Sequence, residues 1–303
     1  MNRRGSICQN ALKEAIESNN AATLELLFQQ KIDPNVTLCD DGELPLIKAA
    51  MCGSDRAMHV ILNHGASVTA TDTWGNTALH WAAVAGNMNC VYLLLQHGIF
   101  KDTFNRLRKT PLMQAVSYEH IDVVRYLIVQ GASTTPELND YDESALTLAS
   151  YAGNVAIVEL ILTVKVPKKF RKRQLYASLT QAVLGEHMAV AQILLTRGAP
   201  VNLPSTSIEN PLFAAIRRGN ASIIRLLLSQ GANVKYVDQH GYTPLMEATR
   251  RRNVDAIRAL LTAGADINAV NMLTRETAFF LAEERGYAEI SEILLEAVAK
   301  RAT

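Results

Sequence analysis

The stretch GNTALHWAAVAGNMNCVYLLLQHG, residues Gly75 to Gly98, begins and ends on a glycine and holds two apolar segments with a polar break between them. Taken alone, the segments predict a pair of short helices. The stretch also contains His80 beside Trp81, and a cysteine, Cys90. Whether these residues form a site depends on whether the stretch occurs once or is one copy of a repeated unit.

A period of 33 or 34 residues runs through the chain. The alanine of LHWA recurs at that spacing, at Ala49, Ala82, Ala115, Ala149, Ala182, Ala215, Ala248 and Ala282. The glycine after the second apolar segment recurs at Gly65, Gly98, Gly131, Gly198, Gly231 and Gly264. Lys165 stands where one glycine of this series is missing. Each unit therefore predicts a turn, a short helix, a polar break and a second helix.

The residues at the predicted helix ends suit those places. Prolines stand where first helices should begin. Proline is tolerated there because the N–H that it lacks would have no hydrogen-bond partner within the helix. Threonine or serine stands just before, at Thr77, Thr110, Ser144, Thr243 and Thr277, and can cap the free N–H groups. The recurrent glycine suits the left-handed position after a second helix.

These units resemble the ankyrin repeat. The segments DTWGNTALHWAAVAGN (72–87) and DQHGYTPLMEAT (238–249) are similar to the family's D-x-x-G-x-T-P-L-H-x-A-A-x-x-G signature. The segments VYLLLQHG, LLLSQGANV and LLTAGADIN resemble its V-x-x-L-L-x-x-G-A-D-V-N ending. The resemblance covers nearly the whole chain. It implies an all-α solenoid of about eight to nine helix-turn-helix units joined by β-hairpin-like turns.

We expect one array over residues 1–303, with a capping repeat at 1–37, seven internal repeats at 38–268 and a C-terminal capping repeat at 269–303. The weakest joint is expected between internal repeats four and five. There Lys165 replaces the glycine, and ASLTQAV (177–183) replaces the TPLHxAA pattern. These losses predict a kink or looser packing at that joint.

The composition excludes several classes of protein. Of 303 residues, 49% are apolar and 19% charged, and the net charge of +1 provides no global attraction to nucleic acid or anionic membrane. No apolar run is long enough for a membrane span, and the N-terminus lacks the apolar core of a secretory signal. The four cysteines lack the spacing of zinc or disulfide sites, so they are expected to be reduced and at least half-buried. We expect an intracellular, cytoplasmic protein, with the nucleus as an alternative, and no cofactor or metal.

His80 has a structural and a catalytic interpretation. It occupies the signature's histidine position, where the ankyrin resemblance implies an imidazole that bridges adjacent turns. No acid or nucleophile recurs beside it, and a general base needs a positioned partner. The chain also lacks phosphate-loop, nucleophile-elbow and zinc-protease motifs. We therefore expect no catalytic residue and no enzyme activity.

The segment KVPKKFRKR (165–173) holds six basic residues among nine. Alignment with the neighbouring units places it on the exposed turn that enters the fifth internal repeat. Its interpretations are a nuclear-import signal, a phosphoinositide or nucleic-acid patch, or a solvated turn. The basic residues concerned are Lys168, Lys169, Arg171, Lys172 and Arg173.

The ankyrin resemblance implies a concave surface, lined by turn tips and first helices, on which partners dock. Positions before the turn glycine hold Trp74, Leu107, Tyr141, Gln174 and His240. The first-helix row is aromatic in repeats two to four and basic in repeats six and seven, and such residues anchor interfaces. The expected partner site comprises Trp74, Trp81, Arg108, Tyr118, Tyr141, Tyr151, Arg217, Arg218, Tyr242, Arg250 and Arg251.

Two functions follow from this surface. The leading hypothesis is a monomeric, non-catalytic scaffold or adaptor that binds a protein or peptide with an apolar and an acidic portion. The alternative is a small-molecule or nucleotide receptor that uses Trp74, Trp81 and Arg108. The isolated glycines favour the first, because they form no phosphate-binding loop.

Overall fold

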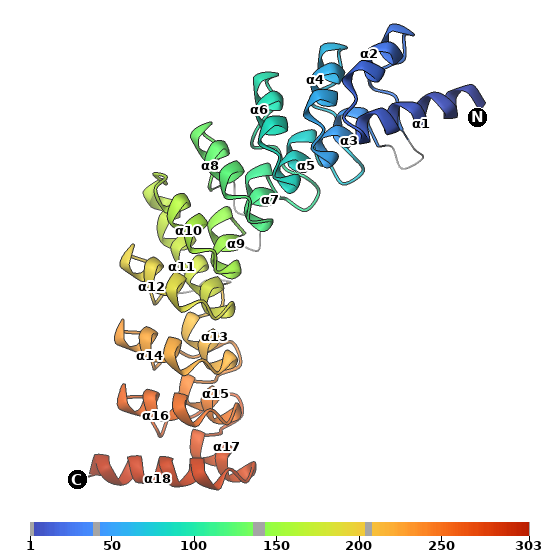
Figure 1. The fold of residues 1–303 in the computed structure, drawn as a ribbon. Coiled ribbons are helices and arrows are strands. Elements are labelled where there is room, and N and C mark those ends of the chain that lie inside the picture. Colours follow the sequence, from blue (N-terminus) through green and yellow to red (C-terminus); the bar gives the residue numbers. More distant parts are fainter. Residues whose placement is uncertain (1–2, 39–42, 136–142, 204–207, 303) are drawn as a thin grey trace. The chain divides into compact units, whose positions relative to one another are not determined.

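The computed structural model describes residues 3–38, 43–135, 143–203 and 208–302, which form eighteen helices in nine consecutive pairs (Figure 1). The first helices are α1 (Arg3–Glu17), α3 (Pro45–Cys52), α5 (Ala78–Ala85), α7 (Pro111–Ser117), α9 (Ala145–Ala152), α11 (Lys168–Leu184), α13 (Pro211–Arg218), α15 (Pro244–Arg250) and α17 (Ala278–Glu284). The second helices are α2 (Ala21–Gln29), α4 (Asp55–Asn63), α6 (Met88–Gln96), α8 (Ile121–Val129), α10 (Val155–Leu162), α12 (Met188–Thr196), α14 (Ala221–Ser229), α16 (Val254–Thr262) and α18 (Ala288–Ala302). The expected all-helical repeat is confirmed, with nine units.

The chain divides into two compact units, residues 1–149 with 156–166 and residues 150–155 with 167–303. In unit 1, the first helices α1, α3, α5 and α7 pack in series, and α2, α4, α6 and α8 form a second row. Unit 2 has the same two rows, built from α11, α13, α15 and α17 and from α12, α14, α16 and α18. The division falls in the stretch that contains Lys165. The single array and the looser joint remain predictions.

The core of each unit lies between successive helix pairs. The recurrent alanine is fully buried in every repeat from Ala49 to Ala282, so it sets how closely neighbouring first helices approach. Leucine, isoleucine and valine of the second helices are buried beside it, as at Val91 and Leu94. Cys90 is also fully buried, in agreement with the burial predicted for the cysteines, and burial raises the pKa of its thiol to about 12.

The predicted helix ends are confirmed. Pro45, Pro111, Pro211 and Pro244 are the first residues of α3, α7, α13 and α15. The side chains of Thr110, Thr243 and Thr277 accept hydrogen bonds from the third N–H of the helix that each precedes. The six recurrent glycines after second helices all have φ between 77° and 86°, the left-handed conformation that the sequence predicts.

The hairpin-like turns pair with one another through buried polar groups. Thr71 and Thr77 form an isolated antiparallel bridge at the base of one turn. The Thr77 N–H donates to His80 Nδ1 (3.1 Å), and His80 Nε2 donates to the carbonyl of Lys109 in the following turn (3.0 Å). Both ring nitrogens are therefore occupied and fix the Nε2–H tautomer. The bridging role that the resemblance implied for His80 is confirmed.

Two expectations about exposed segments are wrong. The basic segment is not a turn, because residues 168–173 form the first part of helix α11, and Gln174 is buried inside that helix. The reason is that no proline or capping threonine interrupts the chain between Lys168 and Leu184, so the helix starts earlier than in other repeats. Cys8 and Cys52 are exposed, although the sequence predicts at least half-buried thiols; Cys39 lies outside the described residues.

His80 should make the stability of its repeat depend on pH. Burial lowers the pKa of the His80 imidazole below its ordinary value of 6.5, so the unfolded state takes up the proton first as pH falls. The free energy of unfolding is therefore highest above pH 6.5 and decreases as the pH falls below that value. We expect His80→Gln to weaken this loss, whereas His97→Gln, at an exposed histidine, retains it. Urea unfolding followed by the fluorescence of Trp74 and Trp81 measures the difference, and identical pH profiles would contradict the assignment.

Candidate functional site

Two adjacent turns of unit 1 present large apolar side chains to solvent. Trp74 is 63% exposed at the tip of one turn, and Leu107 is 62% exposed at the tip of the next. The turns are tied together, because the Arg106 N–H donates to the Trp74 carbonyl (2.9 Å) and Asn105 Nδ2 donates to Asn76 Oδ1 (2.8 Å). We call Trp74 and Leu107 the tip patch. Its side chains are exposed on a backbone that hydrogen bonds hold in place.

Trp81 has a structural partner. Its indole Nε1 donates to Asp72 Oδ2 (2.8 Å), and Asp72 Oδ1 accepts the N–H groups of Trp74 and Asn76 at 2.8 Å each. Partial burial raises the pKa of the Asp72 carboxyl, but the hydrogen bonds from Asn76, Trp81 and Trp74 outweigh it, so the pKa lies below its usual value. Asp72 thus connects the helix residue Trp81 to the turn that carries Trp74.

Arg108, Tyr118, Tyr141 and Tyr151 are four further residues of the predicted site. The guanidinium carbon of Arg108 lies 4.7 Å from the centre of the Phe104 ring, a cation–π contact. Tyr118 and Tyr151 are both more than half exposed. Tyr118, in unit 1, stacks parallel to His120; Tyr151 belongs to unit 2, where its carbonyl accepts from His187 Nε2 (2.9 Å). Tyr141 lies outside the described residues.

In unit 2, the predicted basic row is built around a buried carboxylate. The side chain of Glu247 is 1% exposed, and its oxygens bind Arg217 Nε (3.2 Å), Arg250 Nη1 (2.8 Å) and Arg251 Nε (3.1 Å). Arg217 also binds Glu209 (2.7 Å) and Asp238 (3.6 Å). We call these three arginines and three carboxylates the Glu247 cluster. Its formal charge is zero, so this part of the row is less basic than the sequence predicts.

The contacts of the cluster hold its arginines in place. Burial lowers the pKa of the Arg217 guanidinium, but Glu209, Glu247 and Asp238 outweigh burial and raise it. The guanidinium of Arg250 stacks on Tyr242, with its central carbon 4.4 Å from the ring centre. Arg218 is exposed and makes none of these contacts. The sequence shows Glu247 in the first-helix row, but not that three arginines converge on it.

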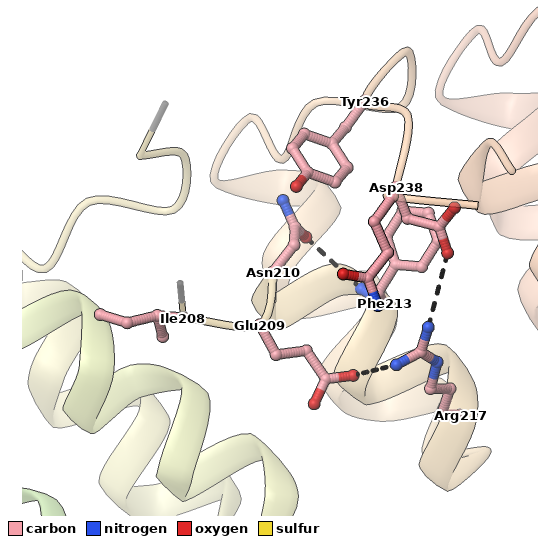
Figure 2. Close-up of a pocket in the computed structure, with 8 residues that line it drawn as sticks. Ile208, Glu209, Asn210, Phe213, Arg217, Tyr236 and Asp238 are labelled. Atoms are coloured by element: carbon pink, nitrogen blue, oxygen red, sulfur yellow. Dashed lines mark hydrogen bonds and ion pairs between the residues drawn. The ribbon is translucent and has the colours of Figure 1, made fainter. Parts of the chain in front are cut away.

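A pocket of about 330 Å³ lies beside the cluster (Figure 2). The rings of Phe213 and Tyr236, which meet edge to face at 5.6 Å, form its apolar wall. Figure 2 shows the Arg217 guanidinium between the carboxylates of Glu209 and Asp238 at the polar side. A pocket with one apolar and one polar wall suits a single side chain of a partner.

The first two turns of α11 form an exposed cationic surface. Lys168, Arg171, Lys172 and Arg173 are exposed, whereas residues 174–180 of the same helix are buried. Cations at a helix N-terminus oppose the helix dipole, so their placement does not serve the stability of α11. The side chain of Lys169 lies outside the described part. The three functional interpretations of this segment remain open.

Within the described residues, no group of three histidine, cysteine or acidic side chains could hold a metal ion. In the same part of the chain, every helix is too short or too polar to cross a membrane. Trp74, Trp81 and Arg108 line none of the three pockets described for this structure, all of which lie in unit 2. Trp74 is 63% exposed, so its ring is available for contact at the surface.

Comparison with known proteins identifies the repeat. A family model described as "Ankyrin repeats (3 copies)" matches residues 12–105, 61–137, 100–173 and 179–271. The crystal structure of the ankyrin repeat domain of Bcl-3 superposes with a TM-score of 0.61 at 31% identity, covering 73% of this chain and 98% of that domain.

Curated relatives are similar over part of the chain. The human neurogenic locus notch homolog protein 1 is 30% identical over 114 residues, which is 38% of this chain and 4% of that protein. An ankyrin repeat protein of fowlpox virus (strain NVSL) is 31% identical over 145 residues, 46% of this chain and 40% of the viral protein. The chain thus spans less than half of either relative.

The buried Glu247 carboxylate should stabilise unit 2. Glu247→Gln leaves three arginines facing an uncharged amide, and we expect the free energy of unfolding to fall by about 2 kcal/mol. Glu209→Gln removes one partly exposed partner of Arg217, with an expected loss below about 1 kcal/mol. Urea unfolding measures both. Equal losses would show that Glu247 is not the centre of the cluster.

Reversing the charge at the start of α11 should stabilise the helix. In Lys168→Glu/Arg171→Glu/Lys172→Glu, acidic side chains face the positive end of the helix dipole, and we expect the midpoint of thermal unfolding to rise by about 2 °C. The control Arg225→Glu, within α14, lies away from a helix N-terminus and should give no rise. A lower midpoint in the triple variant would mean that the cations have stabilising partners.

Proposed function

The chain belongs to the ankyrin-repeat family, and we propose that it is a non-catalytic scaffold or adaptor that binds a partner protein on its turn tips and first helices. Ankyrin repeats mediate protein–protein interactions, so the general role follows from the family. We further propose which residues form the binding surface. In unit 1 it comprises the tip patch with Arg108 and Tyr118, and in unit 2 it comprises Tyr151 and the pocket beside the Glu247 cluster.

The exposure of the tip patch is the observation that carries the proposal. Trp74 and Leu107 make no contribution to the core, since both side chains are almost two-thirds exposed. Their backbone is nevertheless held by hydrogen bonds between the turns. A rigid, exposed tryptophan loses little conformational freedom on binding, which is why such residues anchor interfaces. We infer that the tip patch receives the apolar portion of the partner.

The balanced charges of unit 2 change how an acidic portion of the partner would bind there. Arg217, Arg250 and Arg251 already bind carboxylates, so they would position a partner rather than supply a free positive field. Arg218 retains an exposed cationic group, and Arg251 binds Glu247 through Nε alone. An acidic segment would meet these groups. Tyr242 supports them by holding Arg250 in its cation–π contact.

A nucleotide receptor is less well supported. Such a site would need the Trp81 indole and the Arg108 guanidinium for stacking and phosphate contact. The indole N–H of Trp81 already donates a hydrogen bond to Asp72, and the guanidinium of Arg108 lies over the Phe104 ring.

We also propose that the protein acts as a monomer inside the cell, in the cytoplasm or nucleus. The free thiols of Cys8, Cys52 and Cys90 support the intracellular setting.

The tip patch can be tested by affinity capture. We expect Trp74→Ala/Leu107→Ala to lose most of the partner bound by the unchanged protein, because exposed anchors removed from an interface cost about 2 kcal/mol each. Quantitative mass spectrometry of captured proteins, followed by binding of the purified partner, measures the loss. Trp81, Arg217 and Arg250 are left unchanged, since their structural contacts would confuse a binding defect with a folding defect.

The matched control is Phe100→Ala/Val129→Ala. These side chains are 75% and 72% exposed; Val129 is the last residue of α8, and Phe100 follows α6 by four residues, before the turn that carries Leu107. The control should capture the same partner as the unchanged chain. Identical capture by all three proteins would refute binding through the tip patch.

A further inference from the structure

The junction between α15 and α16 carries a charged residue in a strained backbone conformation. Each repeat has one left-handed residue between its first and second helices, and in five repeats it is glycine: Gly53, Gly86, Gly153, Gly219 and Gly286. In the seventh internal repeat that residue is Arg252, with φ of 54°. A side chain at left-handed φ opposes folding. Backbone strain of this kind clusters at functional sites.

Arg252 lies at an open pocket of about 560 Å³ within unit 2. Gly219, at the end of α13, forms one side of it, and Arg251, Arg252 and Asn253 form the other. Val254 and Asp255 add the first turn of α16, whose free N–H groups form the positive end of a helix dipole. The pocket differs from the one in Figure 2, although Arg217 contributes to the walls of both.

One donor in this pocket has no acceptor. Asn253 Oδ1 caps α16 by accepting the Ala256 N–H (2.9 Å), but its Nδ2 is buried and makes no hydrogen bond. In unit 1, the equivalent Asn87 caps α6 in the same way and its Nδ2 also donates to the Gly53 carbonyl (2.9 Å). A buried donor without an acceptor is unfavourable, so a ligand atom that accepts from Asn253 Nδ2 would be stabilised there.

The side-chain amide of Asn253 lies further from the preceding repeat than that of Asn87. A Cβ atom built on Gly53 would be 2.7 Å from Asn87 Nδ2, whereas one built on Gly219 would be 4.0 Å from Asn253 Nδ2. The amide of Asn253 therefore cannot repeat the contact that Asn87 makes. The gap leaves room for an acceptor from another molecule.

The charges around the gap favour an anion. Arg251 uses Nε for Glu247 and makes no other hydrogen bond in the described part of the chain. The central carbon of the Arg252 guanidinium lies 5.7 Å from the centre of the Tyr287 ring, and within the described residues this guanidinium forms no hydrogen bond or ion pair. Arg217 directs its donors to Glu209, Asp238 and Glu247 and adds no free donor. Arg251, which is already paired with Glu247, and Arg252 thus line the pocket together with the Asn253 amide, and Asp255 is the one carboxylate among the lining residues. This lining suits an anion with several acceptor oxygens.

We propose that this pocket is an oxyanion subsite that holds a phosphate or carboxylate group. The source of the anion, a side chain of the bound partner, rests on the proposed function. The subsite itself does not, because a free oxyanion should also bind. Arg252 supplies charge, Asn253 Nδ2 supplies a directed hydrogen bond, and Arg251 joins the subsite to the Glu247 cluster.

The sharpest test is Arg252→Gly. Glycine relieves the left-handed conformation, so the variant should be at least as stable as the unchanged chain while it loses the cation. Glu186→Gly is the matched control, because Glu186 occupies the same position of another repeat with φ of 62°. Titration with inorganic phosphate, followed by the side-chain amide signals of asparagine in NMR spectra, should show Asn253 shifting in a saturable manner. We expect about tenfold weaker binding for Arg252→Gly and unchanged binding for Glu186→Gly.

A second variant tests the amide donor. Asn253→Ser keeps a side-chain oxygen that can cap α16 but removes Nδ2, so it should also weaken phosphate binding by about tenfold. Asn220→Ser, at the equivalent cap of α14, should not. Arg252→Gly binding phosphate as well as the unchanged chain would overturn the proposal. So would a phosphate response that sodium chloride of equal ionic strength reproduces.

The source of the anion is tested with a peptide. A five-residue peptide with a central phosphoserine should bind more tightly than inorganic phosphate if the subsite serves a partner chain. Equal affinity would overturn that assignment in favour of a free anion. Trp74→Ala/Leu107→Ala should bind phosphate normally, so a failed subsite and a failed tip patch give different results.

Discussion

Every repeat of this protein depends on contact with its neighbours. A pair of short helices cannot bury both of its faces, and the recurrent alanine, fully buried from Ala49 to Ala282, lies on the first helices that pack against one another within each unit. Alanine at that place lets first helices approach closely, and larger apolar residues of the second helices fill the space behind. The spacing between repeats is therefore determined by the smallest side chain in the unit.

Close stacking brings polar backbone groups of adjacent repeats together, and these groups need partners. His80 bonds the carbonyl of Lys109, Asn87 bonds that of Gly53, and His120 bonds that of Val84 (2.8 Å). His80 resembles a site residue in the sequence, but it, Asn87 and His120 each complete an interface between repeats. The groups free for other molecules are those that stacking does not use, at the turn tips and at the junctions between helices.

Unit 2 shows how tertiary contacts change the meaning of a charged residue. Arg217, Arg250 and Arg251 form a basic row in the sequence, which predicts an acidic partner. In the folded unit all three converge on Glu247, and Glu209 and Asp238 complete the charge balance. Among the described residues, Arg252 has no carboxylate partner, and in five repeats its position is occupied by glycine. The difference between these arginines lies in their surroundings and not in their residue type.

The sequence alone determined the repeat, its period, the ends of most helices and the structural role of His80. Each of these depends on residues close together in the chain or on a rule that recurs in several units, such as proline at Pro45 and Pro244 or threonine at Thr110. Only the tertiary structure decided that residues 168–173 are helical, that Trp81 binds Asp72 and that Asn253 lacks the acceptor available to Asn87. These outcomes depend on distances of a few ångströms between side chains and neighbouring turns, and a one-dimensional pattern does not contain such distances.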